Sequence, residues 1–293
     1  MEEKKTSELK NMELDVANRE KKVKEAELKQ NKMYMLILLA GLGIVGVFAF
    51  FLVRNIKQKK KANALLAQQA NEIEEKSKII EQKNIETEQS IVYAKRIQFS
   101  ILPPPHEIGL HLSNYFILYK PKDIVSGDFY FFSERHADAK KKSGEVILAA
   151  IDCTGHGVPG AFMSMVGNEK LKDAVDVSHQ PGIILNELNK QLKQALRQSG
   201  DATSTRDGMD LSLCSIPAFL NGAESAKIKY AGANRPLWVI KKGSKDVEEV
   251  RATKHAIGGL TSDHQEFDQH EITLQKGDTF YLSTDGYADQ FGG

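Results

Sequence analysis

The stretch Val146–Gly160, VILAAIDCTGHGVPG, combines residue types that can bind a cation and an anion at one place. Its apolar run Val146–Ile151 indicates a buried strand, and that strand ends in the carboxylate of Asp152. The glycine turn that follows leads into an expected helix at about Ala161–Asp176. A carboxylate can hold a metal ion, and N–H groups at a helix N-terminus favour phosphate. An ordinary strand–turn–helix corner with a solvated aspartate would have the same local pattern.

Two further aspartates occupy similar positions. Asp128 lies between Gly127 and an aromatic strand-like run, and Asp285 lies between a second strand-like run and Gly286. Hard divalent ions such as Mg²⁺ and Mn²⁺ need oxygen ligands, and carboxylates from different strands can supply a two-metal site. Each aspartate alone could instead be exposed and cap a turn. The set of three is the stronger indication.

Six blocks of sequence accompany these aspartates. They are SGDFYFF (126–132), IDCTGHGVPGAFMSM (151–165), GMDLSLC (208–214), YAGANRPLW (230–238), AIGGL (256–260) and GDTFYLSTDGYAD (277–289). In combination and order they resemble the SpoIIE-like (RsbU-like) bacterial members of the type 2C, or PPM, metal-dependent Ser/Thr phosphatases. The resemblance covers about residues 90–293.

The resemblance implies a dinuclear Mn²⁺ or Mg²⁺ site. Asp128 and Asp152 would be the central metal ligands, Cys153 would contribute its backbone carbonyl, and Asp285 would be the third carboxylate. Two metals can polarise a phosphate and lower the pKa of a bridging water, so that metal-bound hydroxide attacks phosphorus. No protein nucleophile is required, which fits motifs built from aspartate and glycine.

Other polar residues in or near the blocks each allow two interpretations. His156 is a candidate general acid, although the turn could use it as a packed or capping residue. Lys122 and Arg235 are candidates for binding the substrate phosphate, and both could equally be surface charges. Of Asp207 and Asp210, one could touch an additional, weaker metal; a turn role fits at least as well.

The C-terminus departs from the family pattern. Relatives carry a final metal-binding aspartate in a strand well beyond the Asp-Gly turn, whereas this sequence ends at Gln290–Gly293. We therefore expect either a fragment of a longer product or a protein with impaired activity, and the ending favours a fragment.

Composition limits the alternatives. The net charge of +1 gives no charge-based case for nucleic-acid binding. The two cysteines, Cys153 and Cys214, lie in apolar strand-like contexts without metal-binding spacing. We expect them to be buried packing residues in a reducing compartment.

The N-terminal third has the pattern of a membrane anchor. Residues 1–32 form a charged flank, helical or disordered. Residues 33–53 carry no charge and are long enough to span a bilayer as one helix. Because Lys and Arg lie on both sides, charge does not decide the orientation. The resemblance favours the inner membrane of the cell, with the C-terminal part in the cytoplasm.

Residues 54–102 read as a linker helix. Leu66, Ile73 and Ile80 recur at seven-residue spacing, although the second seam position holds small or polar residues. This favours a short, imperfect parallel coiled coil and hence a homodimer; a single solvated helix is the alternative. The end of this segment is amphipathic, and Pro103–Pro105 ends the helix. The resemblance implies that this position couples a sensor to the phosphatase core, so Val92–Leu102 is the candidate switch.

The remaining sequence, 103–293, reads as a phosphatase domain of α+β class. Strands cluster around a helix pair and do not alternate with helices. The expected strands are 115–119, 127–133, 146–152, 211–216, 227–231, 237–241, 247–251, 271–274 and 279–283, and the second helix is 183–198. The resemblance sharpens this to an α-β-β-α sandwich of two antiparallel sheets flanked by helices.

Two functions are compatible with these features. The first is a membrane-tethered serine/threonine phosphoprotein phosphatase in bacterial signal transduction, whose family-typical substrate would be a phosphorylated anti-sigma-factor antagonist. The second is a pseudophosphatase or scaffold that binds a phosphoprotein without turnover. The three aspartates favour the first, and the short C-terminus favours the second.

Overall fold

The computed structural model describes residues 2–112, 114–138, 143–199, 204–218 and 223–289, and it leaves the side chains of 2–5 and 135–143 undescribed. The chain divides into two compact units, Met1–Lys83 and Asn84–Gly293. The terminal residues Gln290–Gly293, on which the expectation of an incomplete C-terminus depends, lie outside the described residues.

The first unit is helical. Helix α1 (Glu2–Ile101) runs without a break, so the charged flank is helical up to the apolar segment. The side chains of residues 33–53 are exposed. Within the described chain, this is the one helix long and apolar enough to cross a membrane, judged by length and composition. Leu66, Ile73 and Ile80 are also exposed, and nothing in the single chain tests whether they pair with another helix.

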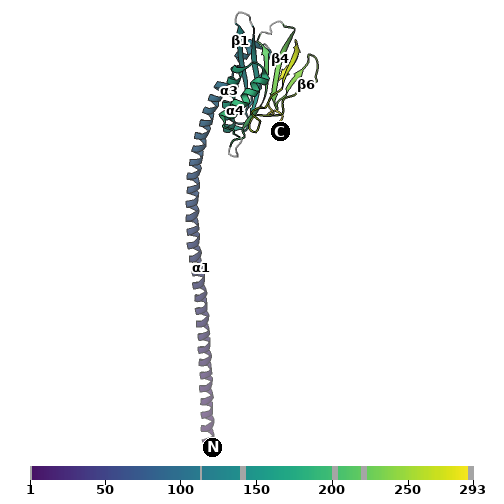
Figure 1. Ribbon diagram of the computed structural model, residues 1–293. Coiled ribbons are helices and arrows are strands. Elements are labelled where there is room, and N and C mark those ends of the chain that lie inside the picture. Colours follow the sequence, from purple (N-terminus) through teal and green to yellow (C-terminus); the bar gives the residue numbers. More distant parts are fainter. Residues whose placement is uncertain (1, 113, 139–142, 200–203, 219–222, 290–293) are drawn as a thin grey trace. The chain divides into compact units, whose positions relative to one another are not determined.

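The second unit contains the last turns of α1, three further helices and two antiparallel sheets (Figure 1). The helices are α2 (Pro105–His111), α3 (Gly157–Val177) and α4 (Pro181–Ala195). The larger sheet has the order β1-β2-β3-β4-β8, with β7 paired to β3. Its strands are β1 (Phe129–Asp138), β2 (Ser143–Cys153), β3 (Gly208–Pro217), β4 (Ser225–Ala233), β7 (Ile257–Gly258) and β8 (Gln269–Gln275). The smaller sheet has the order β6-β5-β9, from β5 (Leu237–Ile240), β6 (Val247–Val250) and β9 (Thr279–Tyr281).

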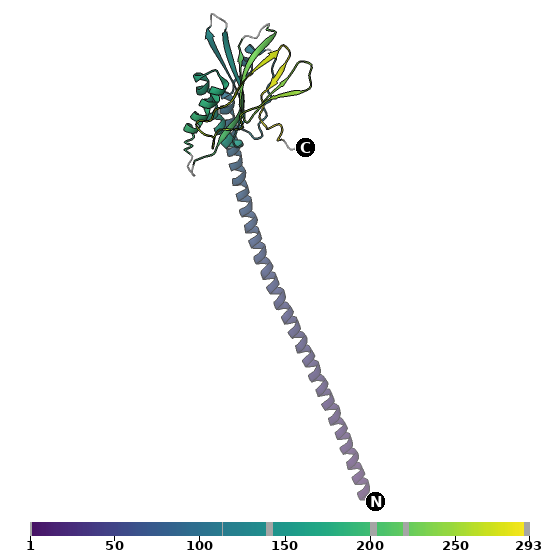
Figure 2. The ribbon, with the colours of Figure 1, turned by 45° about the vertical axis from the view of Figure 1, so that its right-hand side comes forward.

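The two faces of the larger sheet bury different partners, because side chains alternate along a strand. On β2, Ile147 and Ile151 belong to the cluster that contains Leu171 of α3 and Leu188 of α4. Val146 belongs to a second cluster with residues of the smaller sheet. Figure 2 shows the helices on one side of the larger sheet and the yellow-green strands of the smaller sheet on the other. The predicted layered sandwich is therefore confirmed.

Most segments predicted from the sequence as helix or strand are helix or strand in the structure. The tyrosine- and phenylalanine-rich stretch 115–119 is not a strand, so that prediction was wrong. Phe116 is largely exposed, and the Tyr115 hydroxyl donates to the Pro105 carbonyl. Helix α2 and the two-residue strand β7 were not predicted, because both are too short to show a hydrophobic period. Cys153 and Cys214 are buried and unbridged, as expected.

Candidate functional site

Strand register brings three aspartates to one end of the larger sheet. Asp152 on β2 is the direct partner of Asp210 on β3. Asp128 immediately precedes Phe129, whose partner on β2 is Ile151. Since Ile151 faces the helices, its neighbour Asp152 faces the smaller sheet. The three carboxylates therefore lie on the face between the sheets, at the end where β2 finishes and β1 and β3 begin.

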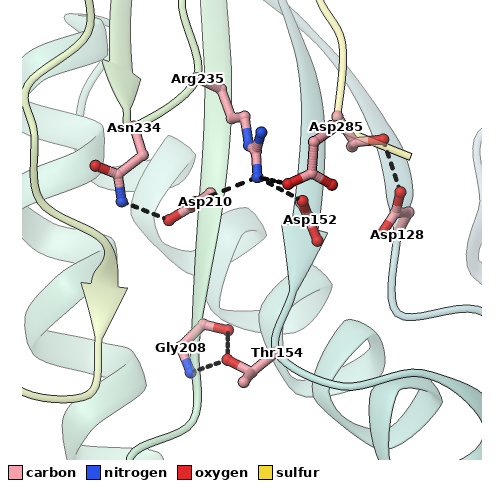
Figure 3. A network of polar contacts seen from close by, with 9 residues as sticks. Asp128, Asp152, Thr154, Gly208, Asp210, Asn234, Arg235 and Asp285 are labelled. Atoms are coloured by element: carbon pink, nitrogen blue, oxygen red, sulfur yellow. Dashed lines mark hydrogen bonds and ion pairs between the residues drawn. The ribbon is translucent and has the colours of Figure 1, made fainter. Parts of the chain in front are cut away.

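The connections to the smaller sheet add an arginine and a fourth carboxylate. Arg235 lies between β4 and β5, and Asp285 follows β9. Arg235 Nη2 lies 2.9 Å from Asp152 Oδ2 and 3.5 Å from Asp210 Oδ2, and it also contacts Asp285 Oδ2 (Figure 3). One guanidinium nitrogen thus contacts carboxylates from three separate segments.

The backbone around Arg235 is held firmly. Asn234 has a positive φ of 58°, a conformation that asparagine tolerates better than most residues. Its side-chain amide donates to Asp210 Oδ1 over 2.8 Å. The hydroxyl of the buried Tyr230 donates to the Arg235 carbonyl over 2.6 Å. These bonds turn the chain sharply between the two sheets and direct the arginine toward the carboxylates.

Asp128 is tied to the segment that carries Asp285. Thr284 Oγ1 donates to Asp128 Oδ2 over 2.7 Å, and the hydroxyl of Tyr119 donates to the Asp128 carbonyl over 3.2 Å. A methyl group on Gly286 would lie 3.6 Å from Asp128 Oδ2. The structure therefore links Asp128 to the segment that carries Asp285, and Asp285 and Asp152 contact the same nitrogen of Arg235. That these three hold a metal stays a prediction.

The carboxylates experience a strongly negative, partly buried environment. Burial raises the pKa of Asp152 far above its usual range, and the charges of Asp128 and Asp285 act in the same direction, whereas Arg235 opposes them. Burial also raises the pKa of Asp210, against the hydrogen bond from Asn234 and the charge of Arg235. Such a cluster needs cationic charge to hold its ionised form.

The turn after Asp152 is fixed to β3 (Figure 3). The Thr154 N–H and hydroxyl both donate to the Gly208 carbonyl, over 2.9 and 2.7 Å, and the Gly208 N–H donates to Thr154 Oγ1 over 2.7 Å. The backbone at two glycines also packs closely against this turn. A Cβ on Gly127, or on Gly160, would lie 2.5 Å from the Gly155 carbonyl oxygen. The loop that carries Asp128 and the turn that follows Asp152 therefore pack backbone against backbone, with no side chain between them.

Helix α1 reaches the same loop through one buried side chain. Gln98 is 1% exposed. Its Oε1 accepts from the Ser126 N–H over 3.1 Å, and its Nε2 donates to the Ser126 carbonyl over 2.6 Å and to Ser164 Oγ over 2.8 Å. The predicted switch helix thus holds the residue two positions before Asp128 and also contacts α3.

The remaining predicted residues lie around this centre. His156 is the N-cap of α3, and its Nδ1 lies 2.8 Å from Asp123 Oδ2; both side chains are exposed. Lys122 is exposed in the same loop as Asp123. Cys153 is buried, and burial raises the pKa of its thiol, so this cysteine is a neutral packing residue.

The ligand atoms at this site are of the type that a divalent metal ion prefers. Four aspartates with one arginine leave excess negative charge at the cluster, and hard cations prefer carboxylate oxygens. In the described part of the chain, however, no three Asp, Glu, His or Cys side chains are grouped as a metal site. Arg235 is instead the cation that the carboxylates contact. A metal bound among these carboxylates would therefore lie close to the Arg235 guanidinium.

Sequence reasoning underrated Asp210 and missed three supporting residues. Asp210 was considered only as a turn residue or a weak metal contact, yet its register with Asp152 places it in the cluster. Gln98, Asn234 and Thr284 were not singled out. Only the alternation of side chains along paired strands could have indicated Asp210 in advance. Asp210 and the apolar Leu211 are adjacent on one strand, so their side chains face opposite sides of the sheet.

Comparisons with known proteins agree with this architecture. The family model of stage II sporulation protein E (SpoIIE) matches residues 142–292. The solved SiaA-PP2C domain of Pseudomonas aeruginosa is 33% identical, with a TM-score of 0.56, and the match covers 72% of this chain and 76% of that one. No curated protein matches the chain.

Two more distant structures were also found. The RsbU and RsbW domains of a Mycobacterium tuberculosis protein are 20% identical, with a TM-score of 0.43, over 58% of this chain and 42% of that one. The PP2C phosphatase domain of Bacillus subtilis SpoIIE, with a regulatory fragment, is 22% identical, with a TM-score of 0.36, over 53% and 39%. At this level of similarity neither adds to the assignment.

The family model covers half of the chain, and the SiaA-PP2C domain shares a third of its residues over most of both chains. The chain belongs to the SpoIIE family of PPM-type, or PP2C-type, protein serine/threonine phosphatases.

Proposed function

We propose that this chain is a membrane-tethered phosphoprotein phosphatase of bacterial signal transduction that uses two Mn²⁺ or Mg²⁺ ions. The observation that carries this proposal is the convergence of Asp152, Asp210 and Asp285 on one guanidinium, with Asp128 linked to the same place through Thr284. Carboxylates of separate strands gather at one point at an electrostatic cost, which a bound cation offsets.

The residues that would hold the metals are Asp128, Asp152 and Asp285, with the Cys153 carbonyl beside them. A methyl group on Gly127 would lie 3.1 Å from that carbonyl oxygen, so it lies against the Asp128 loop. When bound, the two ions would polarise the phosphate and lower the pKa of a water between them. The Thr154–Gly208 bonds and Gln98 would keep the ligand-bearing loops in place during turnover.

His156 would act as the general acid that protonates the leaving serine or threonine oxygen. When both ring nitrogens carry a proton, Asp123 Oδ2 accepts from Nδ1, and Nε2 donates its own proton to the leaving oxygen. Lys122 is exposed in the same loop, and its ammonium would contact the phosphate or the acidic surface of a phosphoprotein.

Residues 33–53 would cross the inner membrane once, with the phosphatase unit in the cytoplasm. The linker 54–102 would pair with a second copy as a coiled coil, so that the protein is a homodimer. A signal that shifts this helix would reach the Asp128 loop through Gln98. The proposed substrate is a phosphorylated anti-sigma-factor antagonist, the type of substrate typical of the family.

The test is turnover by the full chain in detergent or nanodiscs. We expect hydrolysis of p-nitrophenyl phosphate that depends on Mn²⁺, with Asp152→Asn reducing the rate by about 100-fold or more. Metal-independent turnover, or an unaffected variant, would contradict the proposal. A folded chain that binds a phosphoprotein but never hydrolyses it would instead identify a pseudophosphatase. Membrane fractionation and protease protection would test the orientation.

A further inference from the structure

Arg235 makes an unusual set of contacts for an arginine among carboxylates. All three of its ion pairs use one nitrogen, Nη2, which contacts Asp152, Asp210 and Asp285 (Figure 3). Arginine usually binds a carboxylate through two parallel N–H groups. Here the guanidinium inserts its tip between three carboxylates from different segments, as a small cation would.

Two of the three carboxylates that contact Arg235 are largely shielded from water, whereas the Asp285 side chain is 41% exposed. The side chains of Arg235 and Asp152 are each 19% exposed, and that of Asp210 is 25% exposed. Three carboxyl groups face this single guanidinium, so one cation is shared among three acidic side chains. A divalent ion placed among the same carboxylates would meet the Arg235 head group there, because both cations are attracted to Asp152, Asp210 and Asp285.

The backbone of Arg235 is held by two hydrogen bonds that do not involve the carboxylates. Its carbonyl accepts from Tyr230, and its N–H donates to the Ala233 carbonyl over 2.7 Å. By contrast, Arg235 Nε is buried and has no hydrogen-bond partner. An unsatisfied buried donor costs free energy. Movement of the head group is therefore favoured once another cation binds the carboxylates, whereas the backbone is expected to stay in place.

We infer that Arg235 is the built-in cation of the metal-free site: a divalent ion and the guanidinium compete for Asp152, Asp210 and Asp285, and metal entry releases Arg235 to bind the substrate phosphate. The competition follows from the contacts alone, and the phosphate step rests on the proposed function. A freed guanidinium offers paired donors, including the unsatisfied Nε–H, which match two phosphate oxygens.

The first test measures Mn²⁺ binding to the full chain by calorimetry, without any substrate. Arg235→Gln removes the competing charge and should tighten Mn²⁺ binding about tenfold. Arg235→Lys keeps a charge with a shorter reach and should fall between the two. The matched control is Arg251→Gln, which removes the same charge at an exposed position outside the cluster and should leave Mn²⁺ affinity unchanged.

The second test measures thermal unfolding of the same variants. Without metal, Arg235→Gln should unfold at a lower temperature than the natural protein, because its carboxylates then lack a cation. Saturating Mn²⁺ should remove that difference. Equal or weaker Mn²⁺ affinity in a folded Arg235→Gln protein would overturn the inference, and Arg235→Lys provides the same comparison should the glutamine variant not fold.

The third test uses inorganic phosphate as the probe at saturating Mn²⁺. Arg235→Gln should bind phosphate about tenfold more weakly than the natural protein, and unchanged phosphate affinity would overturn the release step. None of these readouts needs turnover. An inactive protein with the expected shifts would contradict only the proposed function, and an active one with unchanged Mn²⁺ affinity would contradict only the competition.

Discussion

Asp152 and Asp210 are direct cross-strand partners on β2 and β3, and both contact the same nitrogen of Arg235. Like charges opposite one another on a sheet are destabilising, so this pair must be retained for another reason. The arginine offsets part of the repulsion, and a divalent cation would offset more. The Asp152–Asp210 pair therefore lowers the stability of the fold, while the proposed metal chemistry needs both carboxylates.

We predict that Asp210→Asn weakens Mn²⁺ binding by about tenfold, because it removes one carboxylate that faces the cluster. Asp207→Asn is the matched control, since Asp207 lies three residues earlier, just before β3, and is not one of the carboxylates that Arg235 contacts. Calorimetric titration of both variants checks this. Equal affinities in the two would exclude Asp210 from the site.

We predict that Gln98→Leu destabilises the second unit by about 1–3 kcal/mol, because the Ser126 N–H and carbonyl lose their buried partner. Gln89→Leu, an exposed change on the same helix, should stay within about 0.5 kcal/mol of the natural protein. Denaturant unfolding measures both. The Gln98 variant should also show a lower turnover rate, since Asp128 follows Ser126 by two residues; unchanged turnover would remove the link between α1 and the site.

We predict that the role of His156 depends on the leaving group. A general acid matters most when the departing oxygen is strongly basic. His156→Gln should therefore slow hydrolysis of a phosphoserine peptide by about 100-fold and that of p-nitrophenyl phosphate only a few-fold. Parallel steady-state kinetics on the two substrates check this, and an equal loss on both would show that His156 does not donate the proton.

We predict a pH-dependent contribution from Asp278, which closes the turn before β9. Its carboxylate accepts from the Gln275 and Lys242 N–H groups and pairs with Lys241, and these contacts lower its pKa. A lowered folded pKa stabilises the fold above the ordinary value of 3.8, and that contribution is lost as the pH falls through the folded pKa.

Asp278→Asn should therefore unfold at a lower temperature than the natural protein at pH 7, with the difference narrowing below about pH 4. Asp246→Asn, in the exposed turn between β5 and β6, is the control and should follow the natural protein at both pH values. Thermal melts across this range decide the matter. A difference that grows on acidification would have the wrong sign for this mechanism.

The sequence predicted most strands because their alternation or apolar runs are local signals. It failed at residues 115–119, where aromatic residues suggested a strand although the segment has no strand partner. The three principal aspartates were singled out because each stands at the end of a strand-like run, next to or just before a glycine turn. Asp210 was underrated because its place in the cluster depends on its pairing with Asp152 of a distant strand, not on its neighbours in the sequence.

The contacts of Arg235 were the least accessible from sequence. A basic residue in a phosphatase motif suggested phosphate binding, and whether it binds phosphate is still a proposal. Its contact with three carboxylates depends on where two sheets meet, and no local pattern encodes that. The same holds for Gln98: the helical period places either Ile97 or Gln98 on the apolar face, but it does not predict the hydrogen bonds of Gln98 with Ser126.

The crossing of Gly127 and Gly160 over the Gly155 carbonyl has a consequence for genetics. Even alanine at either position would push two ligand-bearing loops apart, although neither glycine need ever touch a phosphate. A saturation library would therefore be depleted at these positions as severely as at the aspartates, and conditional alleles that fail on warming would be expected there. If only glycine is tolerated at these two positions, the reason is that any side chain would clash with the Gly155 carbonyl, and not that the glycine takes part in the reaction.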